Sequence, residues 1–339
     1  MTYGQIRVRS RGMTRLYGLN STARLMVTVG TGTVAGYVMP ITCWAGGGAV
    51  LLPSFKPGRP MAELLRMNPN VMFMSPAQLG ALVDSLPATS WPWQHLVLYV
   101  GGSELSPALS RRVRLRLTQS GFIIYGSTEA GLGAMAHASA ADNRPGFSGY
   151  VVPTAEMEIV DEQGRPVPNG TVGEVRIRAD GMVDRYLDDA ETSDDTFRDG
   201  WFYPGDAGTL GGDQALTLLG RTRELMNLNN VKILPALIDQ ALAEIPGVTD
   251  LAVFALPGPT GTPPAVAVVA AEGFEMKRLG QRYREALPKL PPLMVARVAS
   301  VPRNEMGKVL RAQLAASVRE AMNAQERAAP AANLTEPPA

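Results

Sequence analysis

Short apolar runs alternate with helical stretches through the first third of the chain, and this alternation most restricts its fold. Each run is largely apolar and is followed by glycine, proline or a small polar residue. Such strands are typical of a parallel sheet that helices cover on both faces. The expected strands are 24–29, 49–52, 71–74, 96–100 and 122–125, and the expected helices are 34–45, 60–67, 76–85 and 107–118. The pattern therefore predicts an α/β fold with a doubly wound parallel sheet layer.

From about residue 144 the pattern changes to short strands separated by turn residues. Val175 and Ile177 alternate with Arg176 and Arg178, as in a strand with one buried face. This pattern predicts a small antiparallel barrel or sheet. The acidic run 184–195 is most simply explained as a solvated loop and helix face.

The rest of the chain divides at a short polar connector. We expect a first domain at 1–219, with a parallel-sheet subdomain at about 20–130 and a β-rich subdomain at about 144–219. A hinge is expected at 220–226, followed by a small α+β domain at 227–318. Residues 319–339 include many alanines and prolines and are expected to be a disordered tail.

Bulk composition excludes several classes of function. The 339 residues carry a formal net charge of +1, which gives no electrostatic footprint for nucleic acid or an anionic membrane. The single cysteine, Cys43, excludes an internal disulfide and fits a reducing cytoplasm. His95 and His137 lack metal-ligand spacing. The longest apolar stretch, around 34–52, is interrupted by glycines and Pro40, so no membrane span is expected.

Two expected strands end in small polar loops, where ligands of open α/β sheets bind. Hydroxyl groups suit phosphate oxygens, a carboxylate suits Mg²⁺, and glycines let a flat ligand approach the backbone. An ordinary strand-ending turn is the alternative for each loop. The residues concerned are Gly101, Gly102 and Ser103 in one loop, and Gly126, Ser127, Thr128 and Glu129 in the other.

Two further charged residues stand in turns. Asp206 follows Pro204-Gly205 and could accept both hydroxyls of a ribose, or could merely cap the turn. Lys308 follows Gly307 and could bring a mobile ammonium into a site, or could be a solvated surface lysine.

Together these segments resemble the adenylate-forming (AMP-binding) superfamily of acyl- and aryl-CoA synthetases, adenylation domains and luciferases. The resemblance covers residues 20–315, with several motifs in the expected order. They are Gly101-Gly-Ser-Glu-Leu-Ser-Pro107, Tyr125-Gly-Ser-Thr-Glu129, the stretch from Gly173-Glu174 to Asp199-Gly-Trp-Phe-Tyr-Pro-Gly-Asp206, Gly220-Arg221 and Gly307-Lys308.

The resemblance implies a role for each motif. A carboxylate would attack the α-phosphate of ATP, and a thiol such as CoA would then attack the acyl-adenylate after the small domain rotates. The implied contacts are Gly101, Gly102, Ser103 and Tyr125 at the adenine, Gly126 and Ser127 in the signature loop, Thr128 on the α-phosphate, Glu129 on Mg²⁺, Asp206 and Arg221 on the ribose, Lys308 between carboxylate and phosphate, and Glu224 at the hinge.

Several features depart from the family pattern. The Ser/Thr/Gly-rich phosphate loop with its lysine would precede Met1 and is absent, as is most of the first family subdomain. Gly30-Thr-Gly-Thr33 stands in place of the usual Pro-x-Phe-His substrate-pocket segment. Asn229-Asn230 replaces glycines near the thiol channel, and Pro204 replaces the usual threonine.

The sequence therefore predicts an ATP- and Mg²⁺-dependent acid–thiol ligase, with a fatty or aromatic acid as substrate and CoA as the expected acceptor. A carrier-protein thiol is an alternative acceptor. The other alternative is a catalytically impaired or split relative, which binds nucleotide or acyl-adenylate and needs a partner chain for the phosphate loop.

Overall fold

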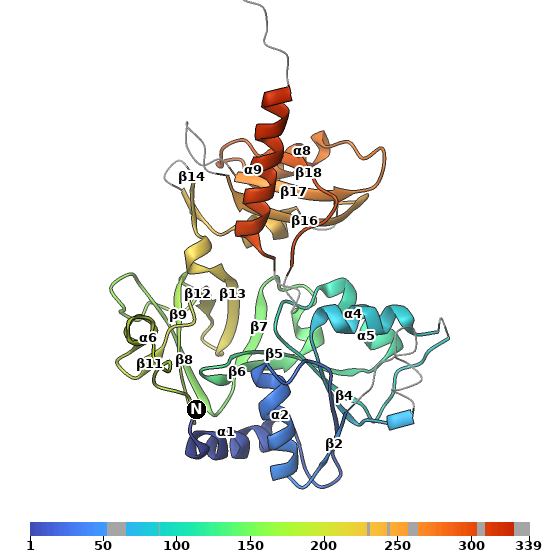
Figure 1. Cartoon of the computed structure of the whole chain (residues 1–339), viewed down its shortest axis with the longest axis vertical. Helices are drawn as coiled ribbons and strands as arrows, with labels where there is room; N and C mark the ends of the chain where they lie inside the picture. The colour runs from blue at the N-terminus through green and yellow to red at the C-terminus, as the bar shows by residue number, and fades with distance from the viewer. Residues whose placement is uncertain are drawn as a thin grey trace, which may run out of the picture. The chain divides into compact units, whose positions relative to one another are not determined.

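The computed structural model describes residues 1–52, 66–87, 89–228, 231–242, 245–256, 264–303 and 309–328. These residues form two compact units that divide between Arg223 and Glu224, within the expected hinge segment. We call them the first unit and the second unit (Figure 1). The helix expected at 60–67 lies almost wholly outside the described residues, and so do Asn229-Asn230 and Gly307-Lys308.

A parallel sheet with strand order β2-β1-β3-β4-β5 forms the centre of the first unit. Each strand overlaps its predicted range. The strands are β1 (Arg24–Val27), β2 (Ala49–Leu51), β3 (Val71–Met74), β4 (Val97–Val100) and β5 (Ser120–Ser127).

Helices cover both faces of this sheet, which confirms the predicted doubly wound fold class (Figure 1). One face packs against α1 (Tyr3–Leu16) and α2 (Val34–Ala45), and the other against α4 (Pro76–Ser85) and α5 (Pro107–Arg116). Val71 and Phe73 point to the first pair of helices, whereas Met72 and Met74 point to the second. Two buried faces explain why these strands carry so few polar residues.

Local capping explains where these helices begin. Ser106 caps α5, since its hydroxyl accepts the N–H of Leu109 at 3.3 Å, and Pro107 occupies the first turn as predicted. No element was expected before residue 24, yet α1 begins with a capping box between Thr2 and Gln5.

The β-rich part continues the same sheet with antiparallel strands, as Figure 1 shows. The order from β5 is β6-β7-β13-β12-β9-β11-β10, and β8 also pairs with β9. The elements are β6 (Gly131–His137), η1 (Ala138–Ala141), β7 (Phe147–Val151), β8 (Ala155–Val160), β9 (Gly173–Ala179), α6 (Ala190–Thr196), β10 (Phe197–Arg198), β11 (Trp201–Phe202), β12 (Asp206–Leu210) and β13 (Ala215–Arg221).

The predicted end of one strand was wrong. The strand expected to stop at Gly126 continues through Ser127, because these two residues pair with Leu132 and Gly131 of β6. The candidate loop is therefore the turn of a β5–β6 hairpin.

The second unit has the α+β composition that the sequence predicts. Its buried residues include Val253, Val266 and Val268 of the sheet, with Leu279 and Tyr283 of α8. The elements are η2 (Thr222–Glu224) at its start, β14 (Met226–Leu228), β15 (Val231–Ile233), α7 (Pro235–Ala241), β16 (Val248–Ala255), β17 (Pro264–Ala270), α8 (Lys277–Ala286), β18 (Met294–Arg297) and α9 (Arg311–Ala328). β17 pairs antiparallel with β16 and parallel with β18.

The prediction of a disordered tail at 319–339 was wrong for residues 319–328. These residues are helical and form the second half of α9. Leu314 and Val318 are buried beside Ala252, Phe254 and other sheet residues, and this packing continues the helix past the predicted boundary. Residues 329–339 lie outside the described part of the chain.

Cys43 and the two histidines have structural surroundings. Cys43 is buried in α2, and burial raises the pKa of its thiol. His137 lies between the carbonyl of Gln119 and the hydroxyl of Ser139, and His95 stacks on Trp93. Across the described ranges, none of the helices combines the length and apolar character needed to cross a bilayer.

Candidate active site

The candidate site is built around the β5–β6 turn, which holds Thr128 and Glu129. The hydroxyl of Ser127 accepts the N–H of Ala130 at 2.9 Å and closes this turn. A Cβ at Gly126 would lie 2.2 Å from the carbonyl oxygen of Gly131, so only glycine fits here. Thr128 is exposed, which leaves its hydroxyl accessible from solvent.

The second predicted loop follows the neighbouring strand. Val100 of β4 pairs with Ile123 of β5, so Gly101 lies beside Ile124 at the carboxyl edge of the sheet. A Cβ at Gly101 would lie 2.7 Å from Ile124 Cγ1. Gly102 follows with φ +98°, a conformation that favours glycine. The β4 loop therefore lies beside the middle of β5, and the β5–β6 turn lies four residues further along that strand, at Thr128.

Asp206 is the first residue of β12, in the β-rich part of the sheet, and it contacts Tyr125 of β5. It is 9% exposed, its Oδ2 accepts the hydroxyl of Tyr125 at 2.7 Å, and its Oδ1 lies 3.1 Å from Nε of Arg221. Arg221 also donates to the carbonyl of Pro204. A buried carboxylate needs such partners, and these fix it at the start of β12.

Tyr125 acts as a donor in this network. Burial raises the pKa of its phenol well above the ordinary value, and the neighbouring Asp206 carboxylate raises it further. The phenol is therefore neutral at physiological pH and keeps its proton for Asp206.

Glu129 is held from two sides. Its Oε1 accepts the hydroxyl of Tyr186 at 2.8 Å. Its backbone carbonyl accepts Nη2 of Arg9 at 2.6 Å and the N–H of Val183 at 3.0 Å. Arg9 also donates to the carbonyl of Thr128 at 2.9 Å.

A divalent cation at Glu129 would need further oxygen ligands from elsewhere. Within the described residues, no cluster of three or more His, Cys, Asp or Glu side chains could hold a metal ion. Mg²⁺ commonly binds through one or two carboxylates together with waters and substrate phosphates. The single Glu129 carboxylate fits that mode of binding, whereas a dedicated protein-only site does not.

Most of the predicted site residues belong to the first unit. These are Gly101, Gly102, Ser103, Tyr125, Gly126, Ser127, Thr128, Glu129, Asp206 and Arg221. Glu224 begins the second unit, where its carboxylate lies 3.1 Å from Arg311. Lys308 lies outside the described residues.

Residues 30–33 form a local cap. Thr33 Oγ1 accepts the N–H of Gly36 at 3.0 Å and donates to the carbonyl of Gly30 at 2.8 Å. The turn therefore starts α2.

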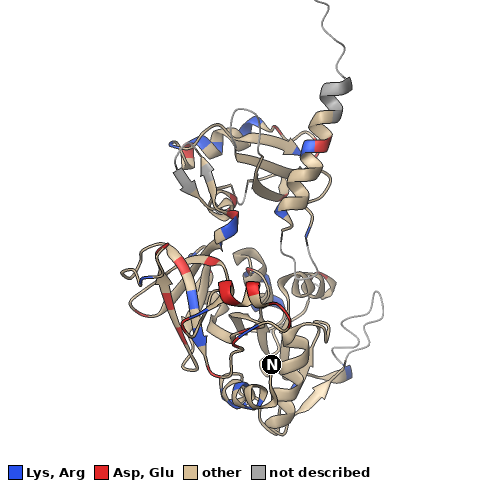
Figure 2. Cartoon of the chain, turned by 60° about the vertical axis from the view of Figure 1, so that its left-hand side comes forward, with Lys and Arg blue, Asp and Glu red and all other residues tan. Residues whose placement is uncertain are grey.

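Sequence reasoning missed Arg9 and Tyr186. Arg9 is one of several arginines in an N-terminal stretch with no strong apolar pattern, so nothing marked it as buried. Tyr186 lies in the acidic run whose charged residues gather around α6 (Figure 2). The one feature of the sequence that could have pointed to Tyr186 is an aromatic residue inside an otherwise acidic run.

Several characterised proteins are similar in sequence. The 4-coumarate–CoA ligase 1 of Glycine max is 31% identical over 236 residues, covering 66% of this chain and 80% of that protein. The indoleacetate–CoA ligase of Aromatoleum aromaticum is 29% identical over 278 residues, covering 78% of this chain and 53% of that protein. The chain thus spans about half the length of the second relative.

Solved structures share the fold. The ATP-bound MatB of Rhodopseudomonas palustris matches with a TM-score of 0.82 at 21% identity, covering 95% of this chain and 65% of that chain. The O-succinylbenzoate coenzyme A synthetase of Bacillus subtilis, with ATP and magnesium ion, matches with a TM-score of 0.80 at 20% identity, covering 92% and 66%. At these identities the likeness establishes the fold alone.

A family model settles the membership. The model described as AMP-binding enzyme matches residues 2–187, more than half of the 339 residues. The match includes the β4 loop and the β5–β6 turn. By this match the chain belongs to the AMP-binding enzyme family.

Proposed function

We propose that this protein activates a carboxylic acid with ATP and transfers the acyl group to a thiol, with CoA as the acceptor. In the first step a carboxylate oxygen forms a bond to the α-phosphorus, and the bond to pyrophosphate breaks. In the second step the thiol sulfur attacks the acyl carbon and AMP leaves. The observation that carries the proposal is the Tyr125–Asp206–Arg221 network beside the Thr128–Glu129 turn, in a chain of this family.

Each part of the site has a role in this proposal. Asp206 and Arg221 bind the ribose, and the neutral Tyr125 holds Asp206 beside the adenine. The glycine-lined edge at Gly101, Gly102 and Gly126, with Ser103 and Ser127, admits the flat base and the phosphates. The exposed Thr128 hydroxyl donates to the α-phosphate.

The reaction brings two anions together, so the site requires positive charge. Glu129 would hold Mg²⁺, which neutralises phosphate charge when bound. Lys308 would bridge the carboxylate and phosphate oxygens, and Glu224 would lie at the hinge between the two steps. Both assignments rest on the motifs in which these residues stand.

The names of two relatives support a proposal for the class of acid. These two act, by name, on 4-coumarate and on indoleacetate, both aromatic carboxylic acids, and both are CoA ligases. We therefore propose an aromatic or fatty acid as substrate.

Carboxylate-dependent ATP–pyrophosphate exchange tests this function over a panel of aromatic, fatty and amino acids. We expect exchange with an aromatic or fatty acid, abolished in Lys308→Ala. Lys289→Ala is the matched control, because Lys289 is an exposed lysine of the second unit. Folded protein that binds ATP without exchange would instead favour the impaired or split relative, which needs a partner chain. Exchange that survives in Lys308→Ala would contradict the role of Lys308.

A further inference from the structure

The turn that carries Thr128 and Glu129 is held by Arg9, which belongs to none of the predicted motifs. Arg9 is 3% exposed, and its guanidinium donates to the carbonyls of Thr128, Glu129 and Gly181 at 2.9, 2.6 and 3.2 Å. Burying a charged group is strongly unfavourable unless its donors find acceptors. Two of the three carbonyl groups that accept hydrogen bonds from Arg9 belong to Thr128 and Glu129 of the candidate site.

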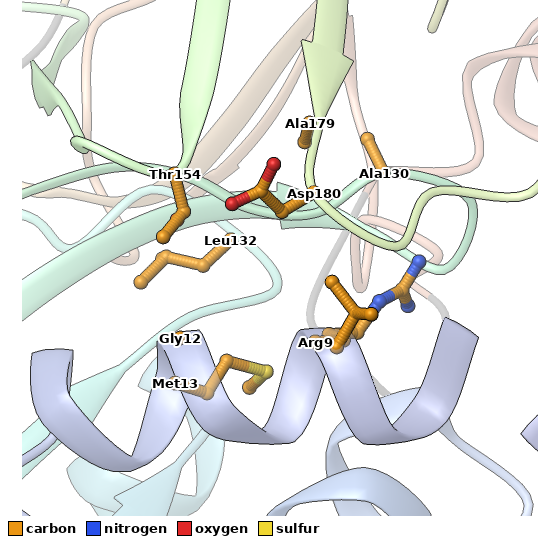
Figure 3. Close-up of a pocket in the computed structure, with 9 residues that line it drawn as sticks. Arg9, Gly12, Met13, Ala130, Leu132, Thr154, Ala179 and Asp180 are labelled. Carbon is orange, nitrogen blue, oxygen red and sulfur yellow. The ribbon is translucent and has the colours of Figure 1, made fainter. Parts of the chain in front are cut away.

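An acidic side chain lies close to Arg9 but is not its partner. Arg9 and Asp180 line the same small pocket, together with Gly12 and Thr154 (Figure 3). Among the described residues, no ion pair joins Arg9 to Asp180, and Nε of Arg9 is buried without a hydrogen-bond partner. Both Nη groups are instead used on the Thr128–Glu129 turn and on Gly181. Arg9 therefore holds the backbone of the Thr128–Glu129 turn and does not serve to neutralise the charge of Asp180.

Two glycines allow α1 to come this close. Gly131 and Gly181 have φ +81° and +72°, where glycine is favoured. A Cβ at Gly131 would lie 3.1 Å from Nε of Arg9, and one at Gly181 would lie 2.7 Å from the carbonyl oxygen of Gln5. The backbone is therefore shaped around α1 at the point where Arg9 enters.

Tyr186 holds the side chain of the same residue. Its hydroxyl donates to Oε1 of Glu129, and its ring packs edge-on against Phe197 at 5.3 Å. Within the described residues, Oε2 of Glu129 accepts no hydrogen bond.

We propose that Arg9 and Tyr186 are positioning residues that direct Oε2 of Glu129 toward a divalent cation. Arg9 fixes the backbone of the turn, and Tyr186 fixes the carboxylate through Oε1. Hydrogen-bond partners of a ligating carboxylate orient it and tune its affinity for metal. The inference rests on the proposed function, in which Glu129 holds Mg²⁺.

The Tyr186→Phe variant tests the carboxylate contact, because it keeps the ring and removes only the hydroxyl. Mn²⁺ binding to the protein–ATP complex, followed by electron paramagnetic resonance, should weaken about tenfold. ATP affinity without divalent cation should not change. In the exchange assay, the Mg²⁺ concentration for half-maximal rate should rise, while the rate at saturating Mg²⁺ is retained. Tyr37→Phe, at a half-exposed tyrosine of α2, is the matched control.

Arg9→Lys and Arg9→Met test the backbone contact. Hydrogen–deuterium exchange of the amides at 126–131 in the nucleotide-free protein should become faster in both variants, and more so in Arg9→Met. Mn²⁺ affinity should fall in the same order. Arg7→Met, at an exposed arginine two positions before Arg9 on α1, is the matched control. If Arg9→Met does not fold, Arg9→Lys still carries the test.

The outcomes separate this inference from the proposed function. Unchanged Mn²⁺ affinity in Tyr186→Phe would overturn the role of Tyr186, and unchanged amide exchange in Arg9→Lys would overturn that of Arg9. A wild-type protein that binds ATP but shows no Mn²⁺ site would overturn the metal role together with the proposed function. Faster amide exchange with weaker Mn²⁺ binding supports the proposal.

Discussion

The buried carboxylate of Asp206 meets the phenol of Tyr125 on one oxygen and the guanidinium of Arg221 on the other. Tyr125 lies 81 positions earlier in the chain, so no local pattern could predict this contact. What the sequence could predict was that small polar loops follow β4 and β5, which are neighbours in the parallel sheet. It did not predict that β5 continues past the end of β4 into a hairpin with β6. The contacts of Arg9 and Tyr186 also join distant segments, and they were not predicted for the same reason.

At the residue scale, we predict that Asp206→Asn weakens ATP binding by about 10- to 100-fold, because hydrogen bonds to a charged acceptor contribute about 1.5–3 kcal/mol. Isothermal titration with ATP and with 2′,3′-dideoxy-ATP measures the effect. Wild type and variant should bind the dideoxy nucleotide with similar affinity, since the ribose hydroxyls are missing.

Asp213→Asn is the control for this prediction. Among the described residues, the Asp213 carboxylate accepts only the N–H of Ala215, in the turn between β12 and β13. An equal loss of affinity for ATP and for the dideoxy nucleotide in Asp206→Asn would show that Asp206 does not act through the ribose.

At the scale of elements, the sequence predicted the buried strands and helices of the parallel sheet well, because two covered faces leave an uninterrupted apolar run. It missed elements that have no clear apolar pattern of their own and are stabilised by the elements they pair with or pack against. β6 is Gly-Leu-Gly-Ala-Met-Ala-His and shows little alternation, yet it pairs along β5. The first turns of α1 and the second half of α9 are rich in charged or small residues, and each is held by packing on one side.

The approach of α1 to the β5–β6 turn gives a prediction at this scale. Gly181→Ala and Gly200→Ala both place alanine at a positive φ, of +72° and +76°. Only the Gly181→Ala variant also brings a Cβ against the backbone of α1. A Cβ at Gly200 would meet no neighbouring atom within 4 Å. We expect Gly181→Ala to lower the free energy of unfolding of the first unit by about 1–3 kcal/mol more than Gly200→Ala does.

Urea unfolding followed by tryptophan fluorescence measures this difference. All four tryptophans, Trp44, Trp91, Trp93 and Trp201, lie in the first unit. Equal losses in the two variants would mean that the close contact between α1 and residue 181 contributes nothing to stability.

At the scale of the whole molecule, the buried clusters of the two units share no residues. The second unit contains a partly buried charged group of its own, in which Asp239 contacts Arg311 and accepts the N–H of Val253 at 2.6 Å. Arg311 also contacts Glu224 at the start of that unit. A change in the charge of Asp239 should therefore change the free energy of unfolding of the second unit.

Burial raises the pKa of Asp239 to about 6 from its usual 3.8, and the attraction of Arg311 only partly opposes this shift. The folded second unit thus holds a proton that the unfolded chain releases between about pH 4 and pH 6. Its free energy of unfolding should fall as pH rises through this window, by up to about 3 kcal/mol from this group, and then level off. Asp239→Asn should remove that component of the pH dependence.

Urea unfolding between pH 4.5 and 7, followed by far-ultraviolet circular dichroism and by tryptophan fluorescence, separates the two units. We expect the difference between wild type and Asp239→Asn to depend on pH in the dichroism transition and not in the fluorescence transition. Glu272→Gln, at an exposed acid of the same unit, should leave the wild-type pH dependence unchanged. A difference between wild type and Asp239→Asn that stays constant between pH 4.5 and 6 would mean that Arg311 outweighs burial and that Asp239 is ionised throughout. An equal response of the tryptophan signal would mean that the two units unfold as one.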